Sequence, residues 1–112
     1  MAKSLTPMES FLAPLAKLAA KYPALEGEVI WAAGSEWQAQ DDDTEFLDVE
    51  EVPFYAEGLL MEGFKLYYQV LAEATAPKEP AHIRLFFWQS NPPALPEAEE
   101  GLTVIAANTW AD

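Results

Sequence analysis

The chain has 112 residues, 51% of them apolar and 12% aromatic, a composition that can build the core of one domain. It carries 19 acidic and six basic residues, so its net charge is −13 at pH 7. This charge repels nucleic acids and anionic lipids, which excludes direct DNA, RNA or membrane-surface binding from the expected functions. The absence of cysteine excludes disulfides, thiol catalysis and cysteine-based metal sites.

The first predicted element is a helix that begins at Thr6 and ends before Pro23. Thr6 and Glu9 form a capping box, and Pro7 fits the first helical turn. Pro14 is expected to kink or divide this helix, because it removes one backbone hydrogen bond. Apolar residues at spacings of three and four predict one buried stripe, made of Met8, Phe11, Leu12, Leu15, Leu18, Ala19 and Tyr22.

Strands are predicted after this helix. Residues 28–33 alternate as a strand does and stop at Gly34, whereas residues 35–51 are expected to form a loop or a poor edge strand. Residues 82–89 have the strongest strand pattern in the chain, and residues 102–107 form a last strand. The strand over residues 82–89 is expected to place Ile83, Leu85 and Phe87 on its core face and His82, Arg84, Phe86 and Trp88 on its outer face.

Residues 52–74 fit two different structures. A helical stripe runs through Leu60, Phe64, Tyr67, Tyr68 and Leu71. The same stretch fits a hairpin with Glu62-Gly63 as its two-residue turn, which places mostly apolar side chains on one side. A helix would contain Gly58 and Gly63, each about 1 kcal/mol less favourable than alanine. We therefore favour the hairpin.

These elements predict a single α+β domain over residues 1–112, with an N-terminal helix packed on a four- to five-stranded, mainly antiparallel sheet. The N-terminal segment is interrupted by Pro7, Glu9 and Pro14 and lacks an apolar stretch of signal-peptide length, so we expect a cytoplasmic protein. No stretch approaches the roughly 20 apolar residues that span a membrane.

The acidic residues are concentrated in one interval. No basic residue lies between Tyr22 and Phe64. This interval holds twelve acids: Glu26, Glu28, Glu36, Asp41, Asp42, Asp43, Glu45, Asp48, Glu50, Glu51, Glu57 and Glu62. Charge of this density attracts basic proteins from a distance.

No metal or cofactor site is predicted. The acids from Asp41 begin like an EF-hand loop, but Phe46 and Val52 occupy the positions that require glycine and glutamate. A solvated acidic loop is the simpler interpretation, and a weak calcium or magnesium site is the rarer one. The lone histidine, His82, has no cysteine and no nucleophile motif beside it, so we expect no catalysis.

In size, charge and class, the chain resembles bacterial and phage proteins that neutralise basic partners: immunity proteins of nuclease toxins, DNA mimics and inhibitors of host defence systems. It also resembles acidic secretion chaperones. We expect a non-catalytic protein that inhibits or sequesters a basic protein, either a toxin or a nucleic-acid-binding protein. The predicted partner-binding residues combine acids with aromatic anchors: Glu36, Trp37, Asp41, Asp42, Asp43, Glu45, Asp48, Glu50, Glu51, Tyr55 and Trp88.

Two other functions stay open. An accessory component of a phage particle or a secretion system, including an effector chaperone, would use apolar outer-face residues rather than charge. A small hydrolase would use a pair of carboxylates, one of them in an apolar pocket, and the sequence identifies no such pair.

Overall fold

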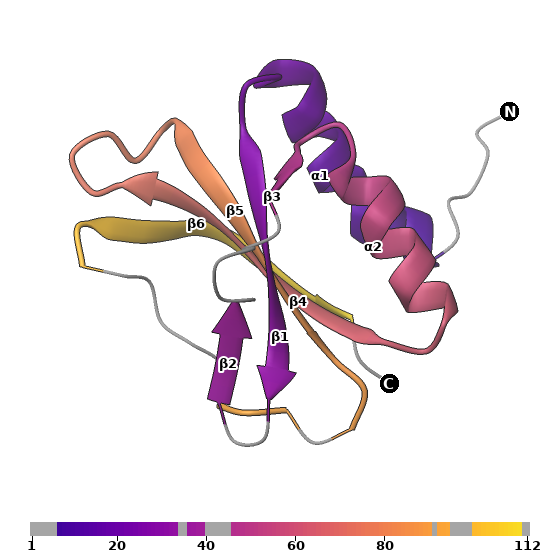
Figure 1. Cartoon of the computed structure of the whole chain (residues 1–112). Coiled ribbons are helices and arrows are strands. Elements are labelled where there is room, and N and C mark those ends of the chain that lie inside the picture. Colours follow the sequence, from indigo (N-terminus) through magenta and orange to yellow (C-terminus); the bar gives the residue numbers. More distant parts are fainter. Residues whose placement is uncertain (1–6, 34–35, 40–45, 91, 95–99, 111–112) are drawn as a thin grey trace, which may run out of the picture.

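The chain begins with a helix, continues with strands, forms a second helix and ends with further strands (Figure 1). The computed structural model describes residues 7–33, 36–39, 46–90, 92–94 and 100–110. In chain order these residues form α1 (Pro7–Lys21), β1 (Glu26–Ala33), β2 (Glu36–Ala39), β3 (Phe46–Asp48), α2 (Val52–Met61), β4 (Lys65–Glu73), β5 (Pro80–Trp88) and β6 (Leu102–Trp110). The predicted α+β class is confirmed.

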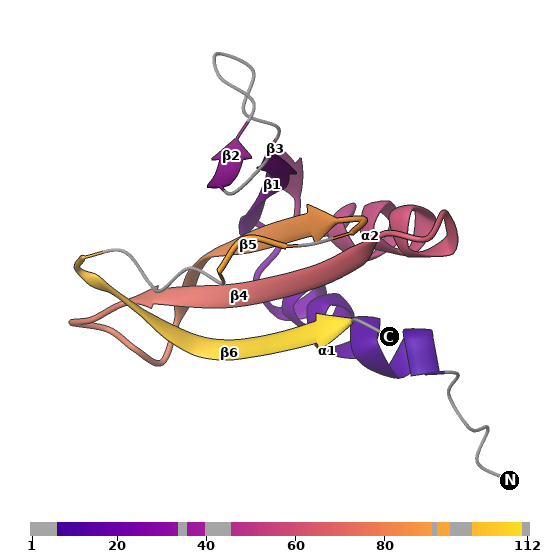
Figure 2. The same cartoon turned by 90° about the horizontal axis from the view of Figure 1, so that it is seen from below.

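The strands form one curled sheet with the order β2-β1-β5-β4-β6, and β3 pairs with β1 as well (Figure 2). β1 and β5 are parallel, with Gly27 opposite Ile83, whereas the other described pairs are antiparallel. The sheet is therefore mixed, and the prediction of a mainly antiparallel sheet is wrong. β4, which follows α2 in the chain, is not a neighbour of β1 in the sheet. β5 lies between them, parallel to β1 and antiparallel to β4.

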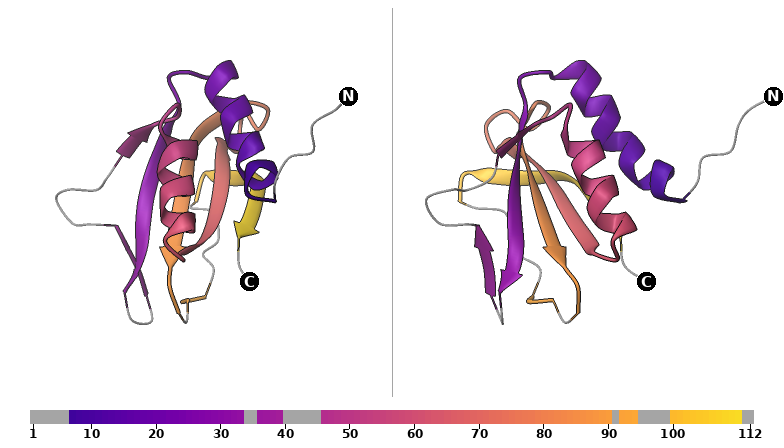
Figure 3. Two further views of the ribbon diagram at one scale, coloured as in Figure 1. Left: turned by 90° about the vertical axis from the view of Figure 1, so that its right-hand side faces the viewer. Right: turned by 45° about the vertical axis from the view of Figure 1, so that its right-hand side comes forward.

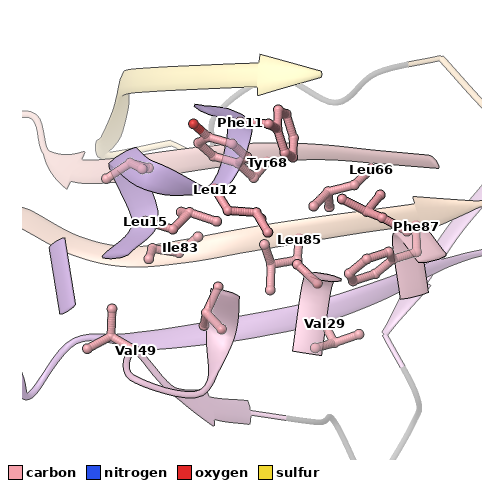
Figure 4. Packing of buried hydrophobic residues seen from close by; sticks show 14 of the residues in the cluster. Phe11, Leu12, Leu15, Val29, Val49, Leu66, Tyr68, Ile83, Leu85 and Phe87 are labelled. Carbon is pink, nitrogen blue, oxygen red and sulfur yellow. The ribbon is translucent and has the colours of Figure 1, made fainter. Parts of the chain in front are cut away.

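Both helices cover the same face of the sheet (Figure 3). α1 buries Phe11, Leu12 and Leu15, three residues of its predicted stripe. They belong to one core cluster with alternate residues of the strands, most of which Figure 4 labels: Val29, Leu66, Tyr68, Val70, Ile83, Leu85 and Phe87. The predicted core face of residues 82–89 is confirmed, because Ile83, Leu85 and Phe87 are fully buried.

Pro14 does not divide α1, which continues from Pro7 to Lys21. Pro14 and Ser10 are both exposed, so water can hydrate the Ser10 carbonyl that loses its helical partner. Thr6, the predicted capping residue, lies outside the described residues. Neither helix in the described ranges is long and apolar enough to cross a membrane.

The hairpin predicted for residues 52–74 is wrong, because the segment is the helix α2 followed by the strand β4. Glu62-Gly63 ends the helix instead of turning a hairpin. Gly63 has a φ of 101°, and the Phe64 and Gly63 amides donate to the carbonyls of Leu59 and Leu60 at 3.1 and 3.2 Å. This is the Schellman motif, in which glycine supplies the left-handed residue.

Tyr68 lies buried on β4 under α1, and its ring meets the edge of the Phe11 ring at 5.4 Å between centroids. Burial raises the pKa of the Tyr68 phenol above its ordinary value, and a hydrogen bond with Asn108 opposes the shift. The neutral phenol therefore stabilises the folded state fully below the unfolded pKa, and this contribution is lost as the pH rises through the folded pKa.

We expect the free energy of unfolding to fall less steeply for Tyr68→Phe than for the wild type as the pH rises above about 10. Urea denaturation followed by circular dichroism at stepped alkaline pH measures both slopes. Equal slopes would show that ionisation of Tyr68 is not coupled to unfolding.

Candidate functional site

The exposed face of α2 presents two large apolar side chains to solvent. Phe54 and Met61 are 78% and 72% exposed, although α2 buries Val52, Ala56 and Leu60 on its opposite face. Positions 54 and 61 are seven residues apart, so they lie on one side of the helix two turns from each other. Burial of a phenylalanine or methionine side chain stabilises a protein by about 1.5–3 kcal/mol, so two such side chains left exposed on one helix face indicate a surface that a partner can cover.

Carboxylates surround these two side chains. Glu50 and Glu51 precede the first turn of α2, Glu57 lies between Phe54 and Met61, and Glu62 follows the last turn. All four glutamates are exposed. We call Phe54, Met61 and these four glutamates the α2 surface.

A shallow hollow of about 540 Å³ adjoins Phe54 on this surface. Its walls are Leu47, Glu50, Glu51, Phe54 and Tyr55. The hollow is therefore lined by apolar side chains together with two carboxylates. An apolar side chain that carries a basic group at its tip, or a basic surface with an apolar projection, fits this chemistry.

The position of the acids at the start of α2 also has a structural explanation, since negative charge favours a helix N-terminus. Glu51 is the N-cap residue of α2, but its side chain makes no capping hydrogen bond to the described backbone. Glu50 and Glu51 are both exposed to solvent. The interval from Tyr22 to Phe64 supplies no basic residue to neutralise them.

The structure brings together part of the predicted site. Asp48, Glu50 and Glu51 lie in and after β3, directly before α2, and all three are exposed. Tyr55 lines the hollow and is half-buried, with its ring 5.9 Å from that of Phe87. The predicted residues Asp41, Asp42, Asp43 and Glu45 lie outside the described residues.

Glu36 and Trp37 lie at the other end of β1. β2 pairs with Ile30–Ala33, whereas β3 pairs with Glu26–Glu28. Those predicted binding residues that the structure describes therefore form two groups, one at each end of β1. The group that precedes and begins α2 is the one that adjoins the exposed side chain of Phe54.

Trp88 is not a surface anchor, because it is 6% exposed, and Phe86 on the same face is fully buried. Trp37 packs on both rings, at 5.9 Å from Trp88 and 5.2 Å from Phe86. The Trp37 Nε1 donates to the Ala94 carbonyl at 2.9 Å. Phe86 and Trp88 therefore lie on the face opposite Ile83, Leu85 and Phe87, as predicted, but the expectation that they are exposed there is wrong, since Trp37 of β2 packs on both.

Phe54, Met61 and Leu47 are site residues that the sequence pattern did not predict. Phe54 and Met61 are separated by seven residues, and a helical interpretation of residues 52–61 would have placed them opposite Val52 and Leu60. The hairpin interpretation instead placed Met61 on the apolar side of a sheet. The four-residue spacing of Val52, Ala56 and Leu60, which is typical of a helix, was therefore the sequence signal that could have predicted this surface.

No three histidine, cysteine or acidic side chains among the described residues gather closely enough to hold a metal ion. His82 is half-buried on β5, opposite Leu71 of β4. Comparisons with family models, curated proteins and solved structures gave no match to this chain.

Proposed function

We propose that this chain is a non-catalytic binding protein that inhibits or sequesters a basic protein through the α2 surface. The observation that supports the proposal is the exposure of Phe54, which is 78% exposed and lines a hollow together with Glu50 and Glu51. Apolar centres with charged rims are the usual organisation of protein interfaces.

The two components of the surface have different roles. The carboxylates attract a basic partner and raise the association rate, but exposed ion pairs contribute only about 0–1 kcal/mol each. Phe54 and Met61 supply the apolar area that becomes buried on binding, where one anchor is worth about 2 kcal/mol or more. The carboxylates therefore select a basic partner, and burial of Phe54 supplies most of the binding free energy.

The class of partner is inferred from the carboxylates and the apolar side chains of the α2 surface. The partner's surface needs lysine or arginine around an apolar pocket or projection, as in a toxin or a nucleic-acid-binding enzyme. The net charge of −13 repels nucleic acid itself, so binding at the basic surface of such an enzyme would exclude its substrate. Inhibition by occlusion requires no catalytic group.

The test starts with capture of partners from a lysate of the native host on immobilised wild-type protein and on Phe54→Ala. Calorimetry with the purified partner then measures affinity at low and high salt. We expect Phe54→Ala to weaken binding by about 30-fold or more. Glu50→Gln with Glu51→Gln should weaken it by about two- to fivefold at low salt and reduce its salt dependence.

The matched control is Glu73→Gln with Glu79→Gln, which removes the same charge from exposed positions near the connection of β4 and β5. This pair should leave affinity nearly unchanged, and circular dichroism should show that every variant is folded. The proposal is wrong if Phe54→Ala binds as well as the wild type, if the captured partner is not basic, or if salt does not weaken the complex.

A further inference from the structure

β6 forms one edge of the sheet and, among the described strands, pairs with β4 alone. It runs for nine residues, Leu102–Trp110, without a charged residue or a proline. Every side chain from Val104 to Thr109 is exposed. Figure 2 shows β6 along the outside of the curled sheet. In an acidic protein, a neutral strip of this length is a distinct feature.

Proteins usually protect a sheet edge with charges, prolines, bulges or short strands, because unpaired backbone groups invite another strand. The opposite edge of this sheet is protected in that way. It consists of β2 and β3, which have four and three residues and carry Glu36 and Asp48. β6 has one of these features, a bulge at Ile105 beside the Val70–Leu71 step of β4, but it is long and carries neither charge nor proline.

We infer that β6 pairs in antiparallel orientation with β6 of a second copy of this chain, joining the two sheets into one. An antiparallel strand pair of identical chains has a two-fold axis, so the assembly closes as a dimer. Pairing of β6 with the short opposite edge would match nine residues with four and would continue as an open chain. The strand lengths therefore favour a β6–β6 contact.

The sequence of β6 is compatible with its own copy. A two-fold pair that uses all nine residues places Leu102 opposite Trp110, Thr103 opposite Thr109, and Ala106 opposite itself. Aromatic–aliphatic and threonine–threonine pairs across strands are favourable. No like charges meet within the nine residues, although each chain carries a net charge of −13. A basic partner would find no carboxylate on this strand.

The affinity of the dimer should depend on salt in the direction opposite to the affinity for a basic partner. Two chains of −13 repel each other at long range, and their neutral edges gain nothing from charge. Screening should therefore strengthen the dimer, whereas it should weaken binding at the α2 surface. This inference does not rest on the proposed function, and each can fail without the other.

Light scattering coupled to size exclusion, across micromolar concentrations and two salt levels, tests the inference. We expect a mass of twice 12.4 kDa that dissociates on dilution and persists better at high salt. Ala106→Lys and Ala106→Glu, each alone, should weaken the dimer by about fivefold or more, because like charges then lie opposite each other. An equimolar mixture of the two variants should restore it through lysine–glutamate pairs.

Ala20→Lys and Ala20→Glu are the matched controls, since Ala20 is exposed on α1. They should leave the dimer intact. A second measurement uses Ala106→Cys, which adds the first cysteine to this cysteine-free chain and should form an intermolecular disulfide on mild oxidation. A monomer at both salt levels, open-ended aggregates, or a dimer unchanged by both Ala106 charge variants would overturn the inference.

Discussion

Replacement of Phe87 by alanine is expected to lower the free energy of unfolding by about 3–5 kcal/mol. Phe87 is fully buried, and its ring lies 5.2 Å from Trp31 of β1 and 5.9 Å from Tyr55 of α2. Truncation leaves a cavity among strands and helix that a rigid sheet fills poorly. Urea denaturation followed by tryptophan fluorescence and circular dichroism measures the loss.

Phe54→Ala is the matched control for this prediction. The residue type and the substitution are the same, but Phe54 is 78% exposed. Its stability should stay within about 0.5 kcal/mol of the wild type. If Phe54→Ala were as destabilising as Phe87→Ala, Phe54 would be a packing residue, and the α2 surface would lose its anchor.

Gly27→Ala is expected to destabilise the protein by about 1–3 kcal/mol through steric overlap. Gly27 is buried on β1, and a Cβ atom there would lie 2.8 Å from Cγ2 of Val52. Val52 is fully buried and begins α2, so relief of the overlap requires the Val52 side chain or the start of the helix to move. Movement of the helix start would shift Glu51 and Phe54 as well, so affinity for a partner at the α2 surface should fall too.

Gly58→Ala provides the opposite expectation. No atom lies within 4 Å of a Cβ built at Gly58, which is exposed in the middle of α2. Alanine should therefore stabilise the protein by about 0.5–1 kcal/mol through its better helix propensity. Chemical denaturation of both variants distinguishes a steric effect from a general effect of alanine.

A double-mutant cycle tests the mechanism at Gly27. Val52→Ala removes the methyl group that a Cβ at position 27 would meet, so the double variant should be more stable than the sum of the two single effects predicts. Strict additivity would mean that contact with Val52 does not cause the loss.

Part of the site could be expected from the sequence, because charge is a property of composition. Asp48, Glu50 and Glu51 were expected to bind a partner; all three are exposed, and Glu50 and Glu51 line the hollow at α2. Exposure of Phe54 could not be expected in the same way. Phe54 is on the surface because α2 buries Val52, Ala56 and Leu60 on its opposite face.

Long-range packing decided the ambiguous segment. Local pattern allowed a hairpin or a helix over residues 52–74, and Glu62-Gly63 suits both a hairpin turn and a helix end. The structure buries Val52, Ala56 and Leu60 at four-residue spacing against the sheet, which selects the helix. Parallel pairing of Gly27 with Ile83 joins residues far apart in sequence, so no local signal could reveal it.

The sequence by itself determined α1, the core face of β5, and the acidity from which we propose the class of partner. These features depend on spacing and composition within single segments, where local physical chemistry dominates. The tertiary structure decided that Trp88 is buried under Trp37, that Phe54 stands exposed among glutamates, and that neutral β6 forms an edge of the sheet. Each of these depends on which segment covers another, and burial is a property of the assembled layers.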